Sequence, residues 1–386
     1  MPSADTVLCL NAGSSSLKFS LFEVDASSER RLATGSIADV GTAQARASLT
    51  VAGKTQQGAR PPRSTSAIDW AFELLETTNL PRPTLIGHRV VHGGPKHTRP
   101  TSIDAEMMRE LQALVPLAPL HQPAAIQGMA STFGKFPDLP QVACFDTAFH
   151  ATIPEFAKRY PLPAPLDAAG VHRYGFHGLS YEYILDALGP ERPAKIVIAH
   201  LGNGASLAAV ANGRCIDTTM GFTPAGGIMM GTRSGDLDPG ILFYLLREQG
   251  YSVDSLEALL ERESGLLGVG GTTDVRALIE RSARDDSARL ALDMFAYAIK
   301  KAIGAYIAAL GGIDLLVFTG GIGEHSAAVR AAACDGLSRL GISLDAERNI
   351  RNEAAIGSDA SPAAVYVIAT DEDRMIARHT RATLRP

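Results

Sequence analysis

Two segments about half a chain apart repeat one pattern: a short apolar strand, a turn of small residues and a return strand. The first segment covers residues 7–24 (VLCLNAGSSSLKFSLFEV) and turns at 11–16. The second covers 196–214 (IVIAHLGNGASLAAVANGR), turns at 201–204 and closes on Asn212-Gly213, a strong two-residue hairpin signal. Because the same unit recurs, we expect a duplicated domain with one such turn in each half.

The composition of these turns is suited to phosphate. In the first turn, Gly13 allows the backbone to approach a ligand, the hydroxyls of residues 14–16 surround it, and Lys18 adds a positive charge. A third glycine-rich turn, 319–326, follows the apolar strand 315–318 and leads into a helix. None of the three sequences has the lysine directly after the second glycine that a P-loop requires. We therefore expect a nucleotide site of another kind; taken alone, the first segment could equally be an ordinary hairpin with a solvated turn.

The bulk properties limit the fold and the partners. A chain of 386 residues with 46% hydrophobic and 20% charged residues suits two domains with sizeable cores. A net charge of −5 gives no electrostatic case for nucleic acid or an anionic membrane. No apolar run approaches the length of a membrane span, and Asn11 and Gly13 interrupt the first one, so we expect neither a membrane helix nor a signal peptide. The four cysteines are scattered without zinc-like spacing, which predicts free thiols in a reducing cytoplasm.

Strand and helix patterns alternate along the rest of the chain, which indicates α/β domains with mixed sheets. We expect a first domain over 1–147, joined by the C-terminal helix 373–386, and a second domain over 148–372. The expected strands lie within 31–50 and at 84–91, 141–145 and 364–369. The expected helices lie at 67–77, 103–114 and 286–309, and a basic final helix runs to about residue 383.

Two charged residues of the first half are candidates for a site. Arg89 lies inside an apolar strand that runs into glycines, where a guanidinium is costly to bury without an anion. A structural ion pair is the alternative. Asp146 follows strand 141–145, and open α/β sheets place ligand residues at the carboxyl ends of their strands. A helix cap or a turn former is the alternative for Asp146.

The second half offers two further candidates. His177 lies between Phe176 and Gly178, where it could serve simply as a turn residue. Arg233 lies in 220–240, a long glycine-rich segment with almost no helix or strand pattern, and such segments in compact domains are usually functional. A salt bridge to a nearby aspartate, at 236 or 238, is the competing role for Arg233.

Nine motifs follow one another from near the first residue to near the last. They are NAGSSSLKF (11–19), GHRVVHGG (87–94), APLHQP (118–123), FDTAFH (145–150), RYGFHGLS (173–180), HLGNGAS (200–206), MGFTPAGGIMMGTRSGDLDPG (220–240), FTGGIGEHS (318–326) and TDEDRMIAR (370–378). In this order the chain resembles acetate kinase, of the acetokinase family within the acetate and sugar kinase and actin superfamily.

The resemblance implies two duplicated ribonuclease H-like (actin-like ATPase) domains with mixed sheets flanking a nucleotide cleft. It implies reversible, direct in-line transfer of the ATP γ-phosphoryl group to acetate, with Mg²⁺ or substitute Mn²⁺, in a cytoplasmic homodimer. A propionate or other short-chain carboxylate kinase is the alternative within the class. A non-kinase actin-like ATPase regulator would explain the phosphate turns, but not Arg89, His177 and Arg233 together.

The resemblance also implies residue roles. The catalytic residues would be Asp146, His177 and Arg233, of which the last two stabilise the transition state. Acetate would meet Arg89 and a methyl pocket of Val91, Leu120, Phe176 and Pro224, and magnesium would be held by Asn11 and Glu372. The phosphates would meet Ser14, Ser16, Lys18, His200, Leu201, Gly202, Asn203 and Gly204. The adenosine would meet Asp274, Val275, Arg276, Gly321, Ile322, Gly323, Glu324 and His325.

The chemistry favours one reading of Asp146 and leaves other questions open. A carboxylic acid with a pKa near that of Glu, about 4.3, is ionised at pH 7 and needs no general base. We therefore expect Asp146 to orient groups and metal-bound waters, although the family's acidic residue is usually described as a proton donor or acceptor.

Three positions depart from the common family wording: Thr273, His325 and Asp371. The last adds a negative charge beside Glu372, with an effect on metal affinity that the sequence leaves undetermined.

Overall fold

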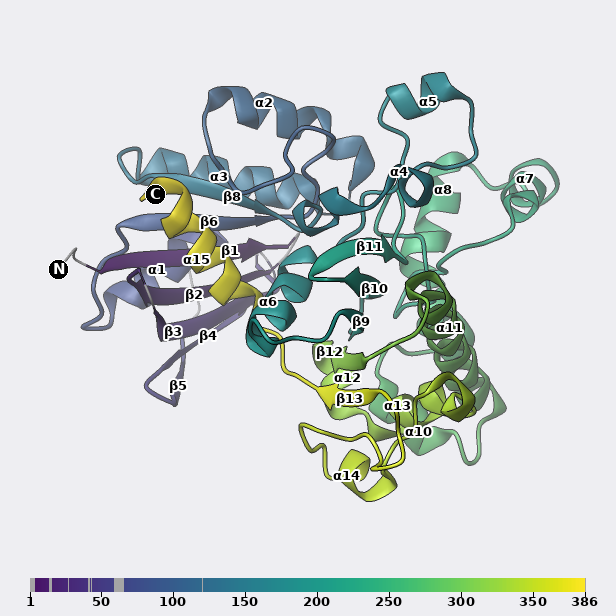
Figure 1. The fold of residues 1–386 in the computed structure, drawn as a ribbon. Coiled ribbons are helices and arrows are strands. Elements are labelled where there is room, and N and C mark those ends of the chain that lie inside the picture. The colour runs from purple at the N-terminus through teal and green to yellow at the C-terminus, as the bar shows by residue number, and fades with distance from the viewer. Residues whose placement is uncertain are drawn as a thin grey trace. The chain divides into compact units, whose positions relative to one another are not determined.

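The computed structural model describes residues 4–13, 16–26, 28–40, 42, 44–58, 66–119 and 121–385 (Figure 1). The chain divides into two compact units, 1–149 with 371–386, and 150–370. The boundaries expected from the sequence, after 147 and after 372, differ by two residues at each place. Asp371 and Glu372 therefore belong with the first unit, because they begin a helix that packs on its sheet.

The first unit is built on an eight-stranded mixed sheet in the order β5-β4-β3-β2-β1-β6-β8-β7. Its hairpin strands β1 and β2 are antiparallel, and β1, β6 and β8 run parallel to one another. The bounds are β1 Asp5–Ala12, β2 Leu17–Val24, β3 Glu29–Ala38, β4 Arg46–Val51, β5 Lys54–Gln57, β6 Leu85–Val90, β7 Thr101–Ser102 and β8 Gln141–Phe145.

The second unit is built on a five-stranded sheet in the order β11-β10-β9-β12-β13. Strands β9, β10 and β11 are antiparallel neighbours, and β9, β12 and β13 run parallel. This arrangement repeats β3-β2-β1-β6-β8 strand for strand, so the duplication expected from the two hairpins is confirmed. The bounds are β9 Lys195–Leu201, β10 Ala205–Ala211, β11 Arg214–Thr218, β12 Leu315–Thr319 and β13 Ala364–Val367.

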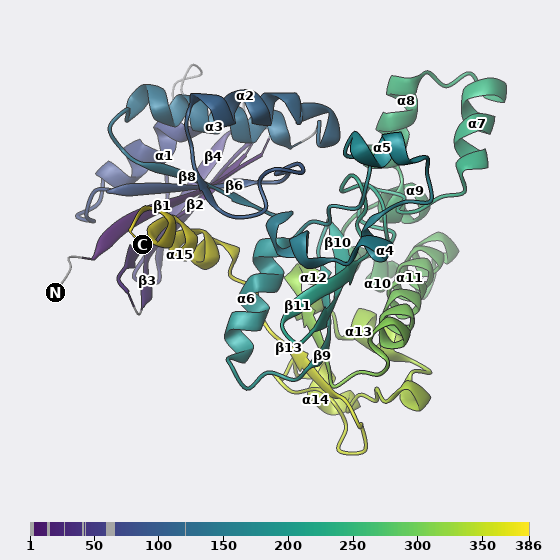
Figure 2. The ribbon, with the colours of Figure 1, turned by 45° about the horizontal axis from the view of Figure 1, so that its top comes forward.

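Helices cover both faces of each sheet (Figure 2). In the first unit, α1, α2 and α3 lie over one face and α15 packs on β1, β6 and β8 from the other. These helices are α1 Ala67–Glu76, α2 Ala105–Ala113, α3 Gln122–Lys135 and α15 Glu372–Leu384. In the second unit, α6 and α11 lie on opposite faces of the sheet (Figure 2).

The helices of the second unit are α4 Glu155–Lys158, α5 Ala164–Ala168, α6 Gly178–Leu188, α7 Pro239–Glu248, α8 Val253–Ala258, α9 Gly265–Gly270, α10 Val275–Arg281, α11 Asp286–Leu310, α12 Gly320–His325, α13 Ala327–Cys334 and α14 Ala346–Ile350. Short 3₁₀ turns lie at Val115–Leu117, Ala148–Thr152 and Ser338–Leu340, and a π-helical turn at Leu259–Glu263. None of the described helices combines the length and the apolar character needed to cross a membrane.

The parallel strands form the centre of each core. Residues 7–10 of β1, 196–199 of β9 and 315–318 of β12 are at most 1% exposed. Strands covered by helices on both faces are buried on both sides, and this is why they are continuous apolar runs in the sequence. All four cysteines are buried free thiols.

One expected turn is a helix in the structure. Residues 319–326 were expected to form a glycine-rich turn, but Gly320–His325 form α12. Glycines have low helix propensity, so no helix was expected at these residues. Two interactions stabilise the short helix: the Glu324 carboxylate accepts a hydrogen bond from the Gly320 N–H at 3.0 Å, and Arg330 Nη1 donates to the Gly323 carbonyl at 2.8 Å. The segment 220–240 carries no helix or strand before α7 begins at Pro239, as expected.

Candidate functional site

The β1–β2 turn places small polar groups at the end of the first hairpin. Asn11 and Lys18 are paired across the strands, and the Gly13 N–H donates to the Ser16 carbonyl at 2.8 Å. A Cβ at Gly13 would lie only 2.8 Å from Ser16 Oγ. Ser16 and Lys18 are exposed there. Ser14, expected to contact phosphate, lies outside the described residues.

Arg89 and Asp146 form a two-pronged ion pair at the carboxyl ends of β6 and β8. Arg89 Nε donates to Asp146 Oδ1 at 3.1 Å, and Nη2 donates to Oδ2 at 2.6 Å. The Asp146 side chain is 1% exposed and that of Arg89 is 19% exposed. The structural ion pair considered from the sequence is therefore present, and it leaves part of the guanidinium accessible. Both carboxylate oxygens of Asp146 are engaged in orienting that guanidinium.

Side-chain oxygens from two other elements, β1 and α15, also lie close to Arg89. Its Nη1 donates to Asn11 Oδ1 at 3.4 Å, and its Nε lies 3.7 Å from Glu372 Oε2. Burial opposes the charge on Arg89, but the carboxylates of Asp146 and Glu372 outweigh it and hold the Arg89 pKa above its ordinary value. The two expected metal ligands, Asn11 and Glu372, thus lie around one cation in the first unit.

The side-chain oxygens of Asn11 and Glu372 fit a magnesium ion whose other ligands are waters and substrate phosphates. The described residues contain no cluster of three or more His, Cys, Asp or Glu side chains suited to a metal. Magnesium does not need one, because it is usually held by one or two carboxylates together with waters and substrate phosphates. The amide oxygen of Asn11 and the carboxylate of Glu372 are hard oxygen ligands of that kind.

The unusual Asp371 is accounted for by its neighbours. It is the N-cap of α15, accepting a hydrogen bond from the Arg374 N–H at 3.1 Å. It also forms an ion pair with Arg31 on β3. The extra negative charge beside Glu372 is therefore balanced within the first unit. Asp373 is half-buried, and the loss of solvent around its carboxylate raises its pKa; it accepts a hydrogen bond from Ser20 Oγ at 2.6 Å.

The β9–β10 turn is shorter and built on glycine. Leu201 pairs with Ala205, and the Gly202 N–H donates to the Gly204 carbonyl at 3.1 Å across the turn. A Cβ at Gly204 would lie 3.4 Å from His177 Nε2 and 3.5 Å from Arg233 Nη1. The two expected catalytic side chains therefore lie within ordinary contact distance of this position of the turn. In addition, the Gly231 N–H donates to the Asn203 carbonyl at 2.9 Å, fixing the long loop to the turn.

His177 has a backbone conformation that is rare for its residue type. It precedes α6 with φ of 60° and ψ of 23°, in the left-handed region. Its Nδ1 lies 2.9 Å from Ser206 Oγ, which also contacts the Tyr181 hydroxyl at 2.5 Å. Its ring stacks on that of His200 with centroids 4.2 Å apart. Such backbone strain is typical of functional positions.

Arg233 is held by the long glycine-rich loop. Its Nη1 donates to the Pro224 carbonyl at 3.1 Å and lies 3.6 Å from the Met230 sulfur. The two aspartates considered as partners accept hydrogen bonds from the backbone: Asp236 from the Gly227 N–H, and Asp238 from the Gly240 N–H, each at 2.7 Å.

His150 positions the turn before His177 and was not assigned a role from the sequence. Burial lowers the His150 pKa to about 4, so the ring is neutral. Its Nε2 donates to the Phe176 carbonyl at 2.9 Å, and its Nδ1 lies 3.2 Å from Cys215 Sγ. The motif FDTAFH contained this histidine, but nothing in its spacing indicated a partner 26 residues away.

The residues expected around adenosine lie at the N-terminus of α10 and along the short helix α12. Asp274 caps α10 by accepting from the Arg276 N–H at 2.9 Å, and the Arg276 side chain is 89% exposed. His325, at the end of α12, is also largely exposed. Arg330 of α13 was not identified from the sequence. It is fully buried and stabilises α12 by donating to the carbonyls of both Gly323 and Glu324.

The expected methyl-pocket residues divide between the two units. Val91 is half-buried after β6 in the first unit, whereas Phe176 and Pro224 are buried in the second. Leu120 lies outside the described residues.

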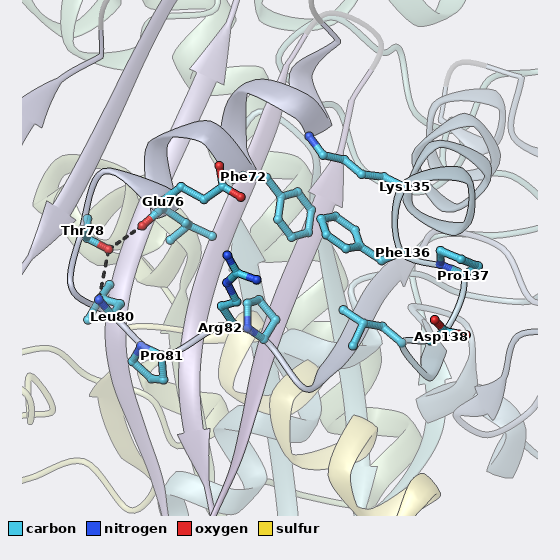
Figure 3. A pocket seen from close by; sticks show the side chains of 13 residues that line it. Phe72, Glu76, Thr78, Leu80, Pro81, Arg82, Lys135, Phe136, Pro137 and Asp138 are labelled. Carbon is cyan, nitrogen blue, oxygen red and sulfur yellow. Dashed lines mark hydrogen bonds between the residues drawn. The ribbon is translucent and has the colours of Figure 1, made fainter.

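A cavity of about 730 Å³ in the first unit lies away from all these residues. It is at the amino ends of β6 and β8, opposite to Arg89 and Asp146. Figure 3 shows the rings of Phe72 and Phe136 next to each other, with Lys135 and Arg82 on either side. Glu76 and Asp138 also line it, so its cations are matched by acids and it does not select for an anion. None of the expected site residues lines this cavity.

Comparison with known proteins gives one consistent result. The sequence profile of the acetokinase family matches residues 6–378. An acetate kinase of Sulfurovum sp. is 45% identical, covering 97% of this chain and 98% of that protein. A propionate kinase of Francisella tularensis superposes with a TM-score of 0.91 at 37% identity, covering 98% of this chain and 99% of that chain. An acetate kinase of Porphyromonas gingivalis superposes with a TM-score of 0.88 at 37% identity, covering 99% and 100%.

The similarity thus extends over nearly the whole sequence and the whole length of its relatives, and it includes both hairpins and both clusters of charged residues. The chain belongs to the acetokinase family.

Proposed function

We propose that this chain transfers the γ-phosphoryl group of ATP to acetate, reversibly, giving acetyl phosphate and ADP. One observation carries the proposal: the family match over 6–378 includes two arginines that the structure holds in place. Arg89 is paired with Asp146, and Arg233 lies beside His177 at the Gly204 turn. A nucleotide-binding regulator would need the phosphate turns, but it would not need both of these arginines.

The chemistry requires charge neutralisation more than proton transfer. The acetate carboxylate is already the nucleophile at pH 7, and its approach to an anionic phosphoryl group is what must be assisted. Arginine serves this purpose because it stays charged and its planar fork matches carboxylate and phosphate oxygens. Arg89 binds acetate, and its partially exposed guanidinium supports this role.

Asp146 acts by orienting Arg89. Both of its oxygens accept from that guanidinium, so the carboxylate fixes the direction in which the remaining N–H groups point. This geometry supports the orienting role over that of a general base, which would need a free oxygen within hydrogen-bond reach of the proton to be removed.

In the second unit, Arg233 and His177 stabilise the transferring phosphoryl group. Both side chains reach the space above Gly204, where a Cβ would contact them. Charge that develops in the transition state is best stabilised by donors already in place, and the Pro224 carbonyl and Ser206 hydroxyl hold these two side chains there. The backbone of 202–204, together with Ser14, Ser16 and Lys18, meets the phosphates.

Magnesium is the metal that this arrangement suits. Asn11 and Glu372 would hold it, directly or through its waters, and it would neutralise charge on the ATP phosphates. Mn²⁺ prefers the same oxygen ligands and can substitute for magnesium. The adenosine lies with Asp274, Val275 and Arg276 and with 321–325 of α12.

Acetate, rather than propionate, is the preferred acceptor. Val91, Leu120, Phe176 and Pro224 are bulky or rigid. Burying one further methylene gains at most about 0.8 kcal/mol, whereas forcing it into a filled site costs about 1–3 kcal/mol. We expect kcat/KM for acetate to exceed that for propionate by several-fold to tens-fold.

An acyl phosphate assay with ATP and acetate, propionate or butyrate tests the function directly. Equal or greater kcat/KM for propionate would identify a propionate kinase, in line with the Francisella relative. ATP hydrolysis that ignores every added carboxylate would identify a regulator. Val91→Ala removes two methyl groups and should narrow the gap between acetate and propionate, mainly by lowering KM for propionate.

The active form is a homodimer. Helix α7 supports this, because none of its residues is buried and it exposes Phe243 and Tyr244 at 54% each. Large exposed aromatic side chains on one helix are typical of a surface that a partner covers. Light scattering of the full chain should give twice 40.7 kDa, and a mass of one chain at micromolar concentration would contradict the proposal.

The compartment is a reducing cytoplasm. Four buried thiols without a disulfide support this. Recovery of the enzyme in the secreted fraction of its host would contradict it.

A further inference from the structure

The Nδ1 side of His200 is defined by two hydroxyl groups, a buried one on Ser180 and a half-buried one on Thr370. His200 lies near the end of β9, and its Nδ1 is 2.8 Å from Ser180 Oγ on the first turn of α6. The Ser180 side chain is 0% exposed. On its other side, Thr370 Oγ1 donates to Ser180 Oγ at 2.9 Å. These three residues therefore form a chain from the end of the second unit to the phosphate hairpin.

The direction of this hydrogen-bond chain follows from the available donors. Because Thr370 donates to Ser180, the proton of the Ser180 hydroxyl needs another acceptor. Among the described residues, the only further hydrogen-bond partner of that hydroxyl is His200 Nδ1. If Nδ1 carried a proton instead, a fully buried hydroxyl would lose its acceptor, and leaving a buried polar group unsatisfied is costly. His200 Nδ1 is therefore an acceptor, and a neutral imidazole that accepts at Nδ1 carries its proton on Nε2.

The protonated edge of His200 faces the glycine turn. A Cβ at Gly202 would lie 3.9 Å from His200 Nε2, just as one at Gly204 would lie 3.4 Å from His177 Nε2. The two imidazoles are stacked, with their planes 21° apart. Both therefore present Nε2 toward the same turn.

The donor of the chain is itself fixed by α12. Glu324 Oε1 accepts from the Gly320 N–H at 3.0 Å and from the Thr370 N–H at 3.2 Å. The Thr370 backbone is thus tied to the helix that the proposed function assigns to adenosine.

We infer that Ser180 and Thr370 are positioning residues that lock His200 in its Nε2–H tautomer, so that it donates a hydrogen bond to a phosphate oxygen of the nucleotide. The inference deepens the proposed function and rests on it for the identity of the ligand. The tautomer itself follows from the contacts alone, and it can be measured without turnover.

The experiment is a long-range ¹H–¹⁵N NMR spectrum of the full chain labelled at histidine nitrogen, with His200 assigned by the loss of its signals in His200→Gln. The unmodified protein should show His200 as a single neutral tautomer protonated at Nε2. Ser180→Ala and Thr370→Val each interrupt the chain, and both should produce a mixture of the two tautomers. Thr370→Ser keeps the hydroxyl and is the matched control, for which the spectrum of the unmodified protein is expected.

Kinetics give a second readout. In Ser180→Ala and Thr370→Val, KM for ATP should rise by about tenfold, the effect of weakening one charge-assisted hydrogen bond, while KM for acetate stays unchanged. Thr370→Ser should restore KM for ATP. If Ser180→Ala does not fold, the two Thr370 variants carry the comparison.

The outcomes separate the two claims. A His200 protonated at Nδ1 in the unmodified protein overturns the inference, and so does a KM for ATP that is equal in Thr370→Val and Thr370→Ser. If His200 is protonated at Nε2 but no carboxylate accepts phosphate from ATP, the tautomer stands and the proposed function is wrong.

Discussion

The two hairpins occupy equivalent places in the two sheets, yet they deliver chemical groups in different ways. In the first, the turn is longer and its own side chains are polar, with Asn11 and Lys18 paired at its base. In the second, the turn consists of residues 202–204 and carries two glycines. Its functional side chains, His177 and Arg233, belong to other segments of the chain.

This difference has a physical cause. A turn without side chains leaves space beside its backbone, and His177 and Arg233 border that space at Gly204. Keeping hydroxyls and an amide in the turn gives oxygen and nitrogen groups close to the backbone, which suits a metal and phosphate oxygens. The same fold unit therefore supports transition-state stabilisation in one copy and metal binding in the other. Variants in the two copies should fail in different steps.

The largest effect is expected in the second copy. Arg233→Ala should lower kcat by about 10³–10⁵ while leaving ATP binding nearly intact, because the charge acts on the transferring phosphoryl group. Steady-state kinetics and nucleotide titration measure the two quantities. Arg284→Ala, at an exposed arginine of the same unit, is the control and should be neutral. A loss below tenfold for Arg233→Ala would show that this residue is structural.

The glycines of the two turns can be compared directly. Gly204→Ala adds a methyl group at contact distance from His177 and Arg233, in the space that the proposed function assigns to the transferring phosphoryl group. We expect about a hundredfold loss in kcat/KM for ATP, because a phosphoryl group displaced from its reactive position is costly. Gly13→Ala meets the end of the Ser16 side chain, which can rotate away, so its loss should be smaller. Gly134→Ala, where a Cβ meets nothing within 4 Å, is the control. Equal losses at Gly204 and Gly13 would remove the distinction between the turns.

In the first copy, Asp146→Asn tests orientation against proton transfer. The amide cannot accept both guanidinium donors of Arg89, so KM for acetate should rise and kcat should fall, each by about tenfold. The loss should be similar for carboxylate acceptors of different pKa. If the loss instead varies systematically with acceptor pKa, Asp146 acts as a base.

Glu372→Ala should raise the magnesium concentration needed for half-maximal rate, since the cation loses a carboxylate that binds it or its waters. Activity measured against magnesium concentration gives the value directly. The equivalent titration of Gly204→Ala should match that of the unmodified protein, because the second turn holds no metal ligand. An unchanged magnesium requirement in Glu372→Ala would exclude this residue from the site.

The smallest effect is expected at Arg31. Arg31→Gln removes one of the two arginines paired with Asp371 and leaves Arg374, whose Nε lies 3.8 Å from Asp371 Oδ2. The charge of Asp371 is then less compensated and attracts the cation, so the magnesium requirement should fall by about two- to threefold at low salt. Arg30→Gln is a closely matched control, because the neighbouring arginine pairs instead with the exposed Glu23. If the two variants behave alike, the charge of Asp371 has no influence on the metal.

The sequence by itself determined the framework. Apolar runs at 7–10, 196–199 and 315–318 predicted the central strands because strands covered on both faces must be apolar throughout. The two hairpins predicted the duplication, since small-residue turns between such strands leave little choice of local structure. The ordered motifs indicated the family and hence the candidate residues. All of these are local patterns, which the chain expresses over a few consecutive residues.

The tertiary structure alone decided how those residues are oriented. Arg89 and Asp146 are 57 residues apart, Ser180 and Thr370 are 190 apart, and Arg31 and Asp371 are 340 apart, so no periodicity relates them. The helix at Gly320–His325 was not predicted from the glycine-rich sequence 319–326, because its stability comes from Arg330 and Glu324, and not from helix propensity. The physical reason is the same in each case: a buried charge or hydroxyl takes whichever partner the packed sheets and helices bring within hydrogen-bond distance, and that partner is set by the fold as a whole.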